Sequence, residues 1–188
     1  MYIITGFGRS GTSFISEIFQ NAGYKMGQYR KEVDAGFENH AVCQINASLG
    51  FSAVLNNDII NKMRNISNNN KIVKDPRFSI TLGNWIEANA NIEGIFWCYR
   101  DFDEILNSTK KSNAGQMQMF RGFDDIDVKE IMQVLKIAFF NLCNRKEIPL
   151  HVINFPESLS DFNQVKCLNA VINNEEHLYK LWKQTVRL

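Results

Sequence analysis

The residues GFGRSGTS, Gly6 to Ser13, decide the fold that this sequence predicts. They follow Tyr2 to Thr5, a short apolar run typical of a buried parallel strand. From Thr12 the apolar side chains follow helical spacing, and this segment ends near Gly23, a usual stop signal. A glycine loop between a strand and a helix directs successive backbone N–H groups into one concavity, and this arrangement favours the binding of phosphate or sulfate.

The loop departs from the Walker pattern of ordinary nucleotide triphosphatases. Gly6 and Gly11 match that pattern, but Thr12 occupies the position of its lysine. The cation of the loop is Arg9, whose guanidinium could lie across a transferring group or its bridging oxygen. The sequence therefore disfavours an ATPase or GTPase. The alternative is a simple glycine turn with a solvent-exposed arginine.

Three more buried-strand runs occur at Lys71 to Lys74, Gly94 to Tyr99 and Leu150 to Phe155, with helix-length segments between them. This alternation predicts an α/β, three-layer P-loop fold with a central parallel sheet and helices on both faces, in one domain spanning residues 1–188. The later helices are expected at Phe37–Leu49, Asp58–Ser67, Ser79–Asn89, Phe102–Lys111, Asp127–Arg145, Leu159–Ile172 and Glu175–Val186.

The segment from Lys111 to Asp127 has no clear periodicity and two glycines, so it is the candidate for a mobile lid.

Composition excludes several classes of protein. The chain has 188 residues, 45% hydrophobic and 22% charged, which argues against disordered, collagenous and membrane proteins. Its 21 Lys and Arg against 20 Asp and Glu predict no general attraction to nucleic acid or anionic lipid. We expect no signal peptide and no membrane span, because the glycine loop begins at Gly6 and no apolar run is long enough.

Four cysteines lie among apolar neighbours without CxxC spacing, which favours reduced thiols and a cytoplasmic location. The predicted strand ends lack an obvious acidic site for magnesium, so no metal is expected.

Arg100 ends the third predicted strand, at the edge of an open α/β sheet where ligands bind. Ser108 follows eight residues later, about two helical turns along. The two can flank one phosphate only if the helix folds back beside the strand end. The alternative is that Arg100 pairs with Asp101 or Asp103 and that Ser108 is merely solvated.

Three motifs together resemble the P-loop sulfotransferases that use 3′-phosphoadenosine 5′-phosphosulfate (PAPS): GFGRSGTS, YRDFDEILNS and KDPR at Lys74 to Arg77. The resemblance implies that the first motif binds the 5′-phosphosulfate and the second the 3′-phosphate. It assigns the 5′ end to Gly8, Arg9, Ser10, Gly11, Thr12 and Ser13, and the 3′-phosphate to Arg100 and Ser108.

Arg9 is similar to the tyrosylprotein and bacterial branch of that family, whereas the cytosolic small-molecule branch has lysine there. The run from His151 to Ile172 is similar to a late strand and helix of these enzymes. The RKG-like segment that in many members closes over the 3′-phosphate has no counterpart in KLWKQTVRL, residues 180–188.

Sulfuryl transfer also needs a base for the acceptor proton. Four candidates follow the first helix: Glu32, Asp34, Glu38 and His40. The stretch GFENHAVCQINASL is similar to a GYFE-type segment of bacterial sulfotransferases, and this favours Glu38, at the expected start of a helix. His40 is second, because imidazole titrates near neutrality. The alternative is that Glu38 only interacts with the helix dipole.

The KDPR segment places Lys74 and Arg77 at the carboxyl end of the second strand, where they could orient the acceptor or the sulfuryl oxygens. The alternative is a structural ion pair between Asp75 and Arg77.

The resulting expectation is a PAPS-dependent sulfotransferase acting on a hydroxyl or amine of a small-molecule or peptide acceptor. Two other hypotheses stay open. One is a PAPS-binding or nucleotide-binding protein without turnover, and the other is a divergent P-loop small-molecule kinase, which Thr12 disfavours.

Overall fold

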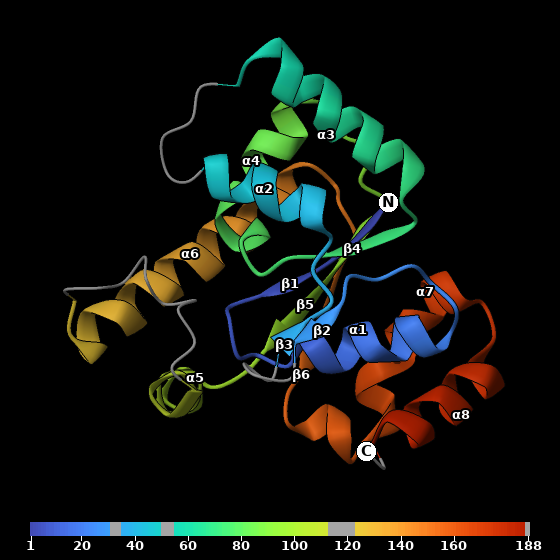
Figure 1. Cartoon of the computed structure of the whole chain (residues 1–188). Coiled ribbons are helices and arrows are strands. Elements are labelled where there is room, and N and C mark those ends of the chain that lie inside the picture. Colours follow the sequence, from blue (N-terminus) through green and yellow to red (C-terminus); the bar gives the residue numbers. More distant parts are fainter. Residues whose placement is uncertain (31–34, 50–54, 113–122, 187–188) are drawn as a thin grey trace.

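The computed structural model describes residues 1–30, 35–49, 55–112 and 123–186. Its centre is a four-stranded parallel sheet in the order β4-β1-β5-β6 (Figure 1). The strands are β1 (Tyr2–Gly6), β4 (Ile72–Lys74), β5 (Gly94–Tyr99) and β6 (Leu150–Asn154). All four carboxyl ends therefore lie at one edge of the sheet, with β1 and β5 in the middle.

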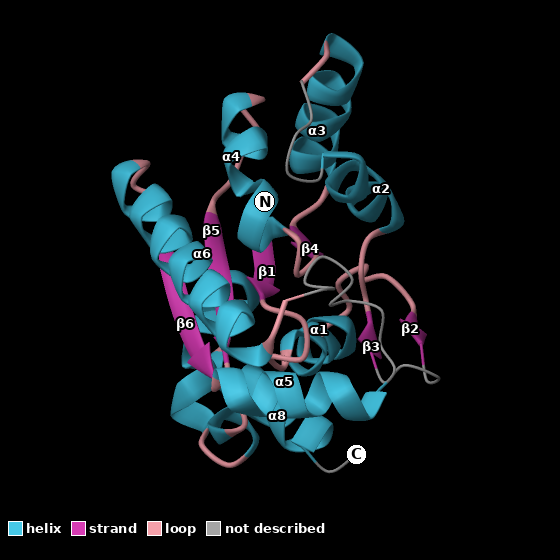
Figure 2. Cartoon of the chain, turned by 90° about the vertical axis from the view of Figure 1, so that its left-hand side faces the viewer, coloured by secondary structure: helices cyan, strands magenta, loops and turns pink. Residues whose placement is uncertain are grey.

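Helices cover both faces of the sheet, as Figures 1 and 2 show from two directions. One face carries α1 (Thr12–Asn21), the 3-10 helix η4 (Phe162–Leu168), α7 (Asn169–Ile172) and α8 (Glu175–Val186). The other carries α2 (His40–Leu49), α3 (Asn57–Asn69), α4 (Phe78–Glu87), α5 (Phe102–Ser112) and α6 (Asp125–Arg145). The predicted three-layer α/β architecture is confirmed.

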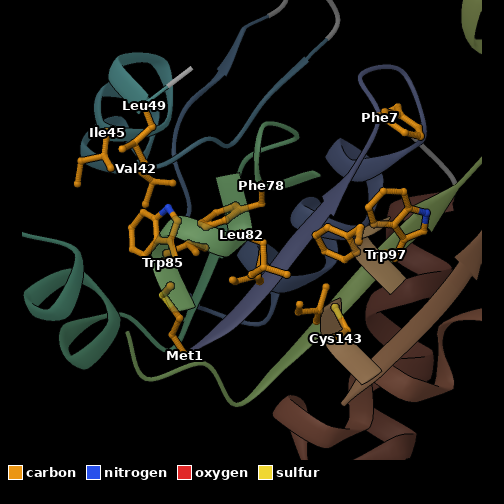
Figure 3. Packing of buried hydrophobic residues seen from close by; sticks show 14 of the residues in the cluster. Met1, Phe7, Val42, Ile45, Leu49, Phe78, Leu82, Trp85, Trp97 and Cys143 are labelled. Atoms are coloured by element: carbon orange, nitrogen blue, oxygen red, sulfur yellow. The ribbon is translucent and has the colours of Figure 1, made fainter. Parts of the chain in front are cut away.

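The period of two along each strand divides the core between these layers. Ile3 and Trp97 face the larger cluster with α4 and α6, while Ile4 and Phe96 face the cluster with α1 and α8. Figure 3 shows part of the larger cluster, including Trp97. Trp97 packs on Phe139 with ring centroids 4.6 Å apart. Burial on both faces explains why the central strands β1 and β5 are almost continuously apolar.

The predicted helix Phe37–Leu49 is wrong at its start. Phe37 has φ of 67°, in the left-handed region, and cannot continue a right-handed helix. The helix begins instead at His40, where the Oδ1 of Asn39 accepts hydrogen bonds from the N–H groups of Ala41 and Val42. Glu38 therefore lies in the connection before α2 and not in its first turn.

The predicted helix Leu159–Ile172 is also wrong. The chain forms two 3-10 helices, η3 (Glu157–Leu159) and η4, before the short helix α7. Asp161 interrupts the segment, because its side chain accepts from the N–H of Asn163 and caps η4.

The described residues also contain a small antiparallel pair, β2 (Tyr29–Arg30) and β3 (Ala35–Gly36), which the sequence did not predict. Within the same ranges no helix has both the length and the apolar character needed to cross a membrane. The four cysteines are free thiols.

Candidate functional site

The glycine loop joins β1 to α1 at the carboxyl edge of the sheet, as predicted. Gly6 has φ of 145° and lies so close to β5 that a Cβ there would meet the carbonyl of Cys98. Gly11 has φ of 91°, and a Cβ there would meet the ring of Phe155. Both positions therefore require glycine for backbone conformation and for space.

The start of α1 has no capping side chain. Gly11 is the N-cap and makes no side-chain hydrogen bond to the first turn, which also lacks acidic residues. The first amides of a helix have no carbonyl partner within it, and the helix dipole adds positive potential there. Thr12 and Ser13 open the helix, with Thr12 buried and Ser13 half-buried. These backbone donors suit a phosphate or sulfate group.

Two loop residues have more specific surroundings. The N–H of Ser10 donates to the carbonyl of Phe7 at 3.2 Å, which tightens the turn around Gly8. The Oγ of Ser10 is fully buried, and no described residue forms a hydrogen bond with it. Arg9 has φ of 71°, an uncommon backbone conformation for a side chain of this kind.

Arg9, Arg100 and Ser108 come together, although the sequence separates them. The Nε of Arg9 donates to the Oγ of Ser108 at 3.1 Å, and Nη1 of Arg100 donates to the carbonyl oxygen of Arg9 at 3.2 Å. The helix α5 thus folds back beside the strand end, as a shared phosphate site requires. Arg100 forms an ion pair with Glu104, 2.8 Å away, and not with Asp101 or Asp103 as in the alternative.

Phe155 is a site residue that the sequence reasoning missed. It follows β6 directly, its ring lies under the guanidinium of Arg100 at 5.3 Å, and it faces Gly11. Its position after a parallel strand was the signal that could have found it, since the same rule pointed to Arg100.

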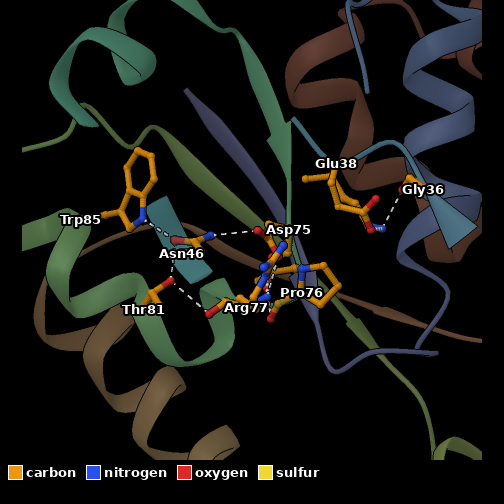
Figure 4. Close-up of polar contacts among 10 residues, drawn as sticks. Gly36, Glu38, Asn46, Asp75, Pro76, Arg77, Thr81 and Trp85 are labelled. Carbon is orange, nitrogen blue, oxygen red and sulfur yellow. Dashed lines mark hydrogen bonds and ion pairs between the residues drawn. The ribbon is translucent and has the colours of Figure 1, made fainter. Parts of the chain in front are cut away.

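The proposed base, Glu38, is paired with Lys74. The Nζ of Lys74 donates to the carbonyl of Gly36 at 2.7 Å and forms an ion pair with Oε1 of Glu38 (Figure 4). The two side chains are only 1% and 9% exposed. A buried ammonium needs such partners, so the pair positions the segment before α2. Nothing in the sequence pattern alone indicated this pairing.

The other candidate bases lie elsewhere. His40 is exposed at the first position of α2. Glu32 and Asp34 lie outside the described residues. Most of the predicted lid, Lys111 to Asp127, also lies outside them, although α5 extends to Ser112 and α6 begins at Asp125.

Asp75 and Arg77 form an ion pair, which is the structural alternative for KDPR. The Nε and the backbone N–H of Arg77 both donate to Oδ1 of Asp75, at 3.0 and 2.9 Å. Oδ2 accepts from Nδ2 of Asn46 at 3.2 Å, and Oδ1 of Asn46 accepts from Thr81 and Trp85, each at 2.8 Å (Figure 4). Asp75 is fully buried, and this network satisfies its carboxylate.

Burial and neighbouring charges shift the pKa values of Arg77 and Cys43, which lie beside Asp75. Burial alone lowers the pKa of Arg77, but the carboxylates of Asp75 and Glu38 outweigh it and raise that pKa above its usual range. Burial, followed by the charge of Asp75, raises the pKa of the Cys43 thiol to about 12, although Arg77 opposes the shift. Cys43 is therefore a protonated thiol at neutral pH and not a nucleophile.

The KDPR turn touches the strand that carries the glycine loop. The Oγ1 of Thr5 donates to the carbonyls of Asp75 and Pro76, at 3.1 and 3.3 Å, and the N–H of Asp75 donates to Ile4. Each of the four strand ends thus contributes one part of the site: the glycine loop, KDPR, Arg100 and Phe155. Within the described ranges, no group of three or more His, Cys, Asp or Glu could hold a metal ion.

Comparison of the chain with protein-family models, with curated proteins and with solved structures gave no match.

Proposed function

We propose that this protein is a PAPS-dependent sulfotransferase that transfers a sulfuryl group to a hydroxyl or amine of a small-molecule or peptide acceptor. The observation that carries the proposal is the convergence of Arg9, Arg100 and Ser108 on the glycine loop. A donor with phosphate groups at two positions needs two anion sites close together, and the nearness of the start of α1 to Arg100 at the end of β5 supports this assignment.

Arg9 has the chemistry that the departing group requires. Negative charge grows on the bridging oxygen as the sulfuryl group leaves, and a guanidinium in a partly buried loop stabilises that charge. Its Nε bond to Ser108 limits the orientations of this side chain. Backbone donors of the same loop and of the first turn of α1 hold the 5′-phosphate, except the N–H of Ser10, which donates to Phe7.

Glu38 is our candidate for the base, and His40 is the second. The acceptor oxygen forms a bond to sulfur while the bond from sulfur to the 5′-phosphate oxygen breaks, and the acceptor proton passes to a carboxylate oxygen of Glu38. The other product is adenosine 3′,5′-bisphosphate. Lys74 fixes Glu38 from the buried side.

Calorimetry with three nucleotides tests the proposal. The bisphosphate should bind more tightly than AMP and ATP, because only it engages both anion sites. Equal affinities for ATP and the bisphosphate would contradict the assignment. Release of the bisphosphate from PAPS in the presence of an acceptor panel then tests transfer itself.

A nucleotide-binding protein without turnover is the second candidate. The observation that favours it is the buried ion pair with Lys74, which occupies the carboxylate of Glu38. Tight binding of the bisphosphate with no transfer to a broad panel of alcohols, phenols and amines would select it.

A further inference from the structure

We propose that Arg77 is a specificity-determining residue that binds an anionic group of the acceptor, such as a carboxylate. The reaction at this site rests on the proposed function, whereas the anion site rests on the surroundings of Arg77 alone.

The guanidinium of Arg77 is anchored on one side only. Its Nε and its backbone N–H share a single oxygen of Asp75, and Asp75 is the one side-chain partner that the described residues give it. The side chain is 38% exposed, whereas Asp75 is fully buried. The two Nη groups are therefore the part of the fork left for a ligand, and two parallel N–H donors match the geometry of a carboxylate.

The anchor itself is rigid. Asn46 holds the second oxygen of Asp75, and Thr81 and Trp85 hold Asn46 from α4. An arginine whose orientation is already fixed loses less side-chain entropy when it binds an anion.

The position and the local charges fit an acceptor. The turn that carries Arg77 is bonded to Thr5, one residue before the glycine loop. The negative charge of nearby Glu38 is neutralised by its ion pair with Lys74, so the positive charge of Arg77 is not needed to neutralise Glu38. Cys43 adds no charge near neutral pH, because burial keeps its thiol protonated. An anionic acceptor bound by Arg77 would thus lie beside the loop that holds the sulfuryl donor.

Matched pairs of acids and esters test this inference. Ligand-observed NMR would compare 4-hydroxyphenylacetate, 3-hydroxybutyrate and N-acetyltyrosine with their methyl esters, on protein saturated with adenosine 3′,5′-bisphosphate. We expect at least one acid to bind about tenfold more tightly than its ester, the effect of one charge-assisted contact. Arg77→Gln should abolish this preference and leave affinity for the bisphosphate unchanged.

Two more variants complete the test. Arg77→Lys keeps the positive charge but lacks the planar guanidinium, so it should lose most of the preference for the acid over the ester. This variant provides the test if Arg77→Gln folds poorly. Arg145→Gln is the matched control. Arg145 ends α6 shortly before β6 begins, so it lies near the amino ends of the strands, away from the carboxyl ends that carry Arg77. It should behave as the wild type.

The outcomes separate this inference from the proposed function. No acid preference in the wild type, including no binding of any probe, overturns the inference, as does a preference that survives Arg77→Gln. If the bisphosphate does not bind but an Arg77-dependent acid preference persists, the sulfotransferase assignment fails and the anion site stands.

Discussion

The Nε of Arg9 lies 3.1 Å from the Oγ of Ser108 and donates a hydrogen bond to it, joining the glycine loop to α5 across 99 residues of sequence. Arg100 strengthens this junction through the carbonyl of Arg9. The two motifs that the sequence offers separately are therefore one structural unit. An anion bound at either motif would contact a residue that the other motif holds in place.

Arg100→Ala should weaken binding of adenosine 3′,5′-bisphosphate by about 1.5 to 3 kcal/mol, because a charge-assisted contact is lost. Ser108→Ala should cost less, since its hydroxyl is neutral. Calorimetry with the bisphosphate and with AMP measures both effects, and AMP binding should change little. Glu104→Gln removes the ion-pair partner of Arg100 but keeps the guanidinium, so it should retain the selectivity. Equal losses for both ligands in Arg100→Ala would contradict the 3′-phosphate assignment.

Arg9→Ala should lower turnover by roughly a hundredfold or more, because its charge matters most as the bridging oxygen becomes negative. Affinity for the bisphosphate should change far less. Single-turnover kinetics together with calorimetry separate these quantities. Ser108→Ala removes the same hydrogen bond and keeps the guanidinium, so its turnover should fall less. A variant that binds poorly but turns over normally would instead assign Arg9 to ground-state binding.

Lys74→Met should destabilise the fold by about 3 to 5 kcal/mol, because it leaves the buried carboxylate of Glu38 without its cation. The double variant Lys74→Met/Glu38→Gln should recover most of this loss. Urea unfolding of the two single variants and the double variant measures the coupling. Simple addition of the single effects would show that the pair does not act as a unit.

Glu38→Gln alone should lose most turnover while the bisphosphate still binds, because the amide cannot accept the acceptor proton.

Gly11→Ala should destabilise the protein more than Gly23→Ala does. Both glycines have positive φ, 91° and 87°, so each substitution carries a backbone penalty of about 1 to 2 kcal/mol. Only at Gly11 does a Cβ meet another residue, Phe155, whereas at Gly23 nothing lies within 4 Å. Thermal and urea unfolding give the difference. Equal losses would mean that Phe155 moves aside freely.

Stability should fall as the pH rises above about 8.5, partly because of Cys43. An unfolded thiol ionises near that pH, whereas burial raises the pKa of the folded Cys43 to about 12. Between these values the unfolded state has released a proton that the folded state keeps, so higher pH favours unfolding. Urea unfolding between pH 8 and 10 should show a shallower decline for Cys43→Ala than for the wild type. Parallel declines would indicate that Cys43 ionises freely in the folded state.

The local pattern of the chain determined the frame of the molecule. Apolar runs separated by helical segments predict buried parallel strands, and GFGRSGTS predicts a tight loop into α1. Both signals depend on backbone preferences and on the period of burial, which act within about ten residues. The rule that ligands gather at the carboxyl ends of parallel strands then predicted that Lys74, Arg77 and Arg100 lie at one edge of the sheet.

Tertiary structure alone decided which partners these residues take. Lys74 contacts Glu38, 36 residues away in the sequence, and Asn46 contacts Asp75, 29 residues away. The local pattern of apolar and polar residues predicts neither contact. Because the backbone of Phe37 is left-handed, α2 begins at His40 and not at Phe37, the start that the sequence pattern predicted. A buried charge or amide takes whichever partner the packed layers bring within reach, because leaving it unpaired costs more free energy than any local preference supplies.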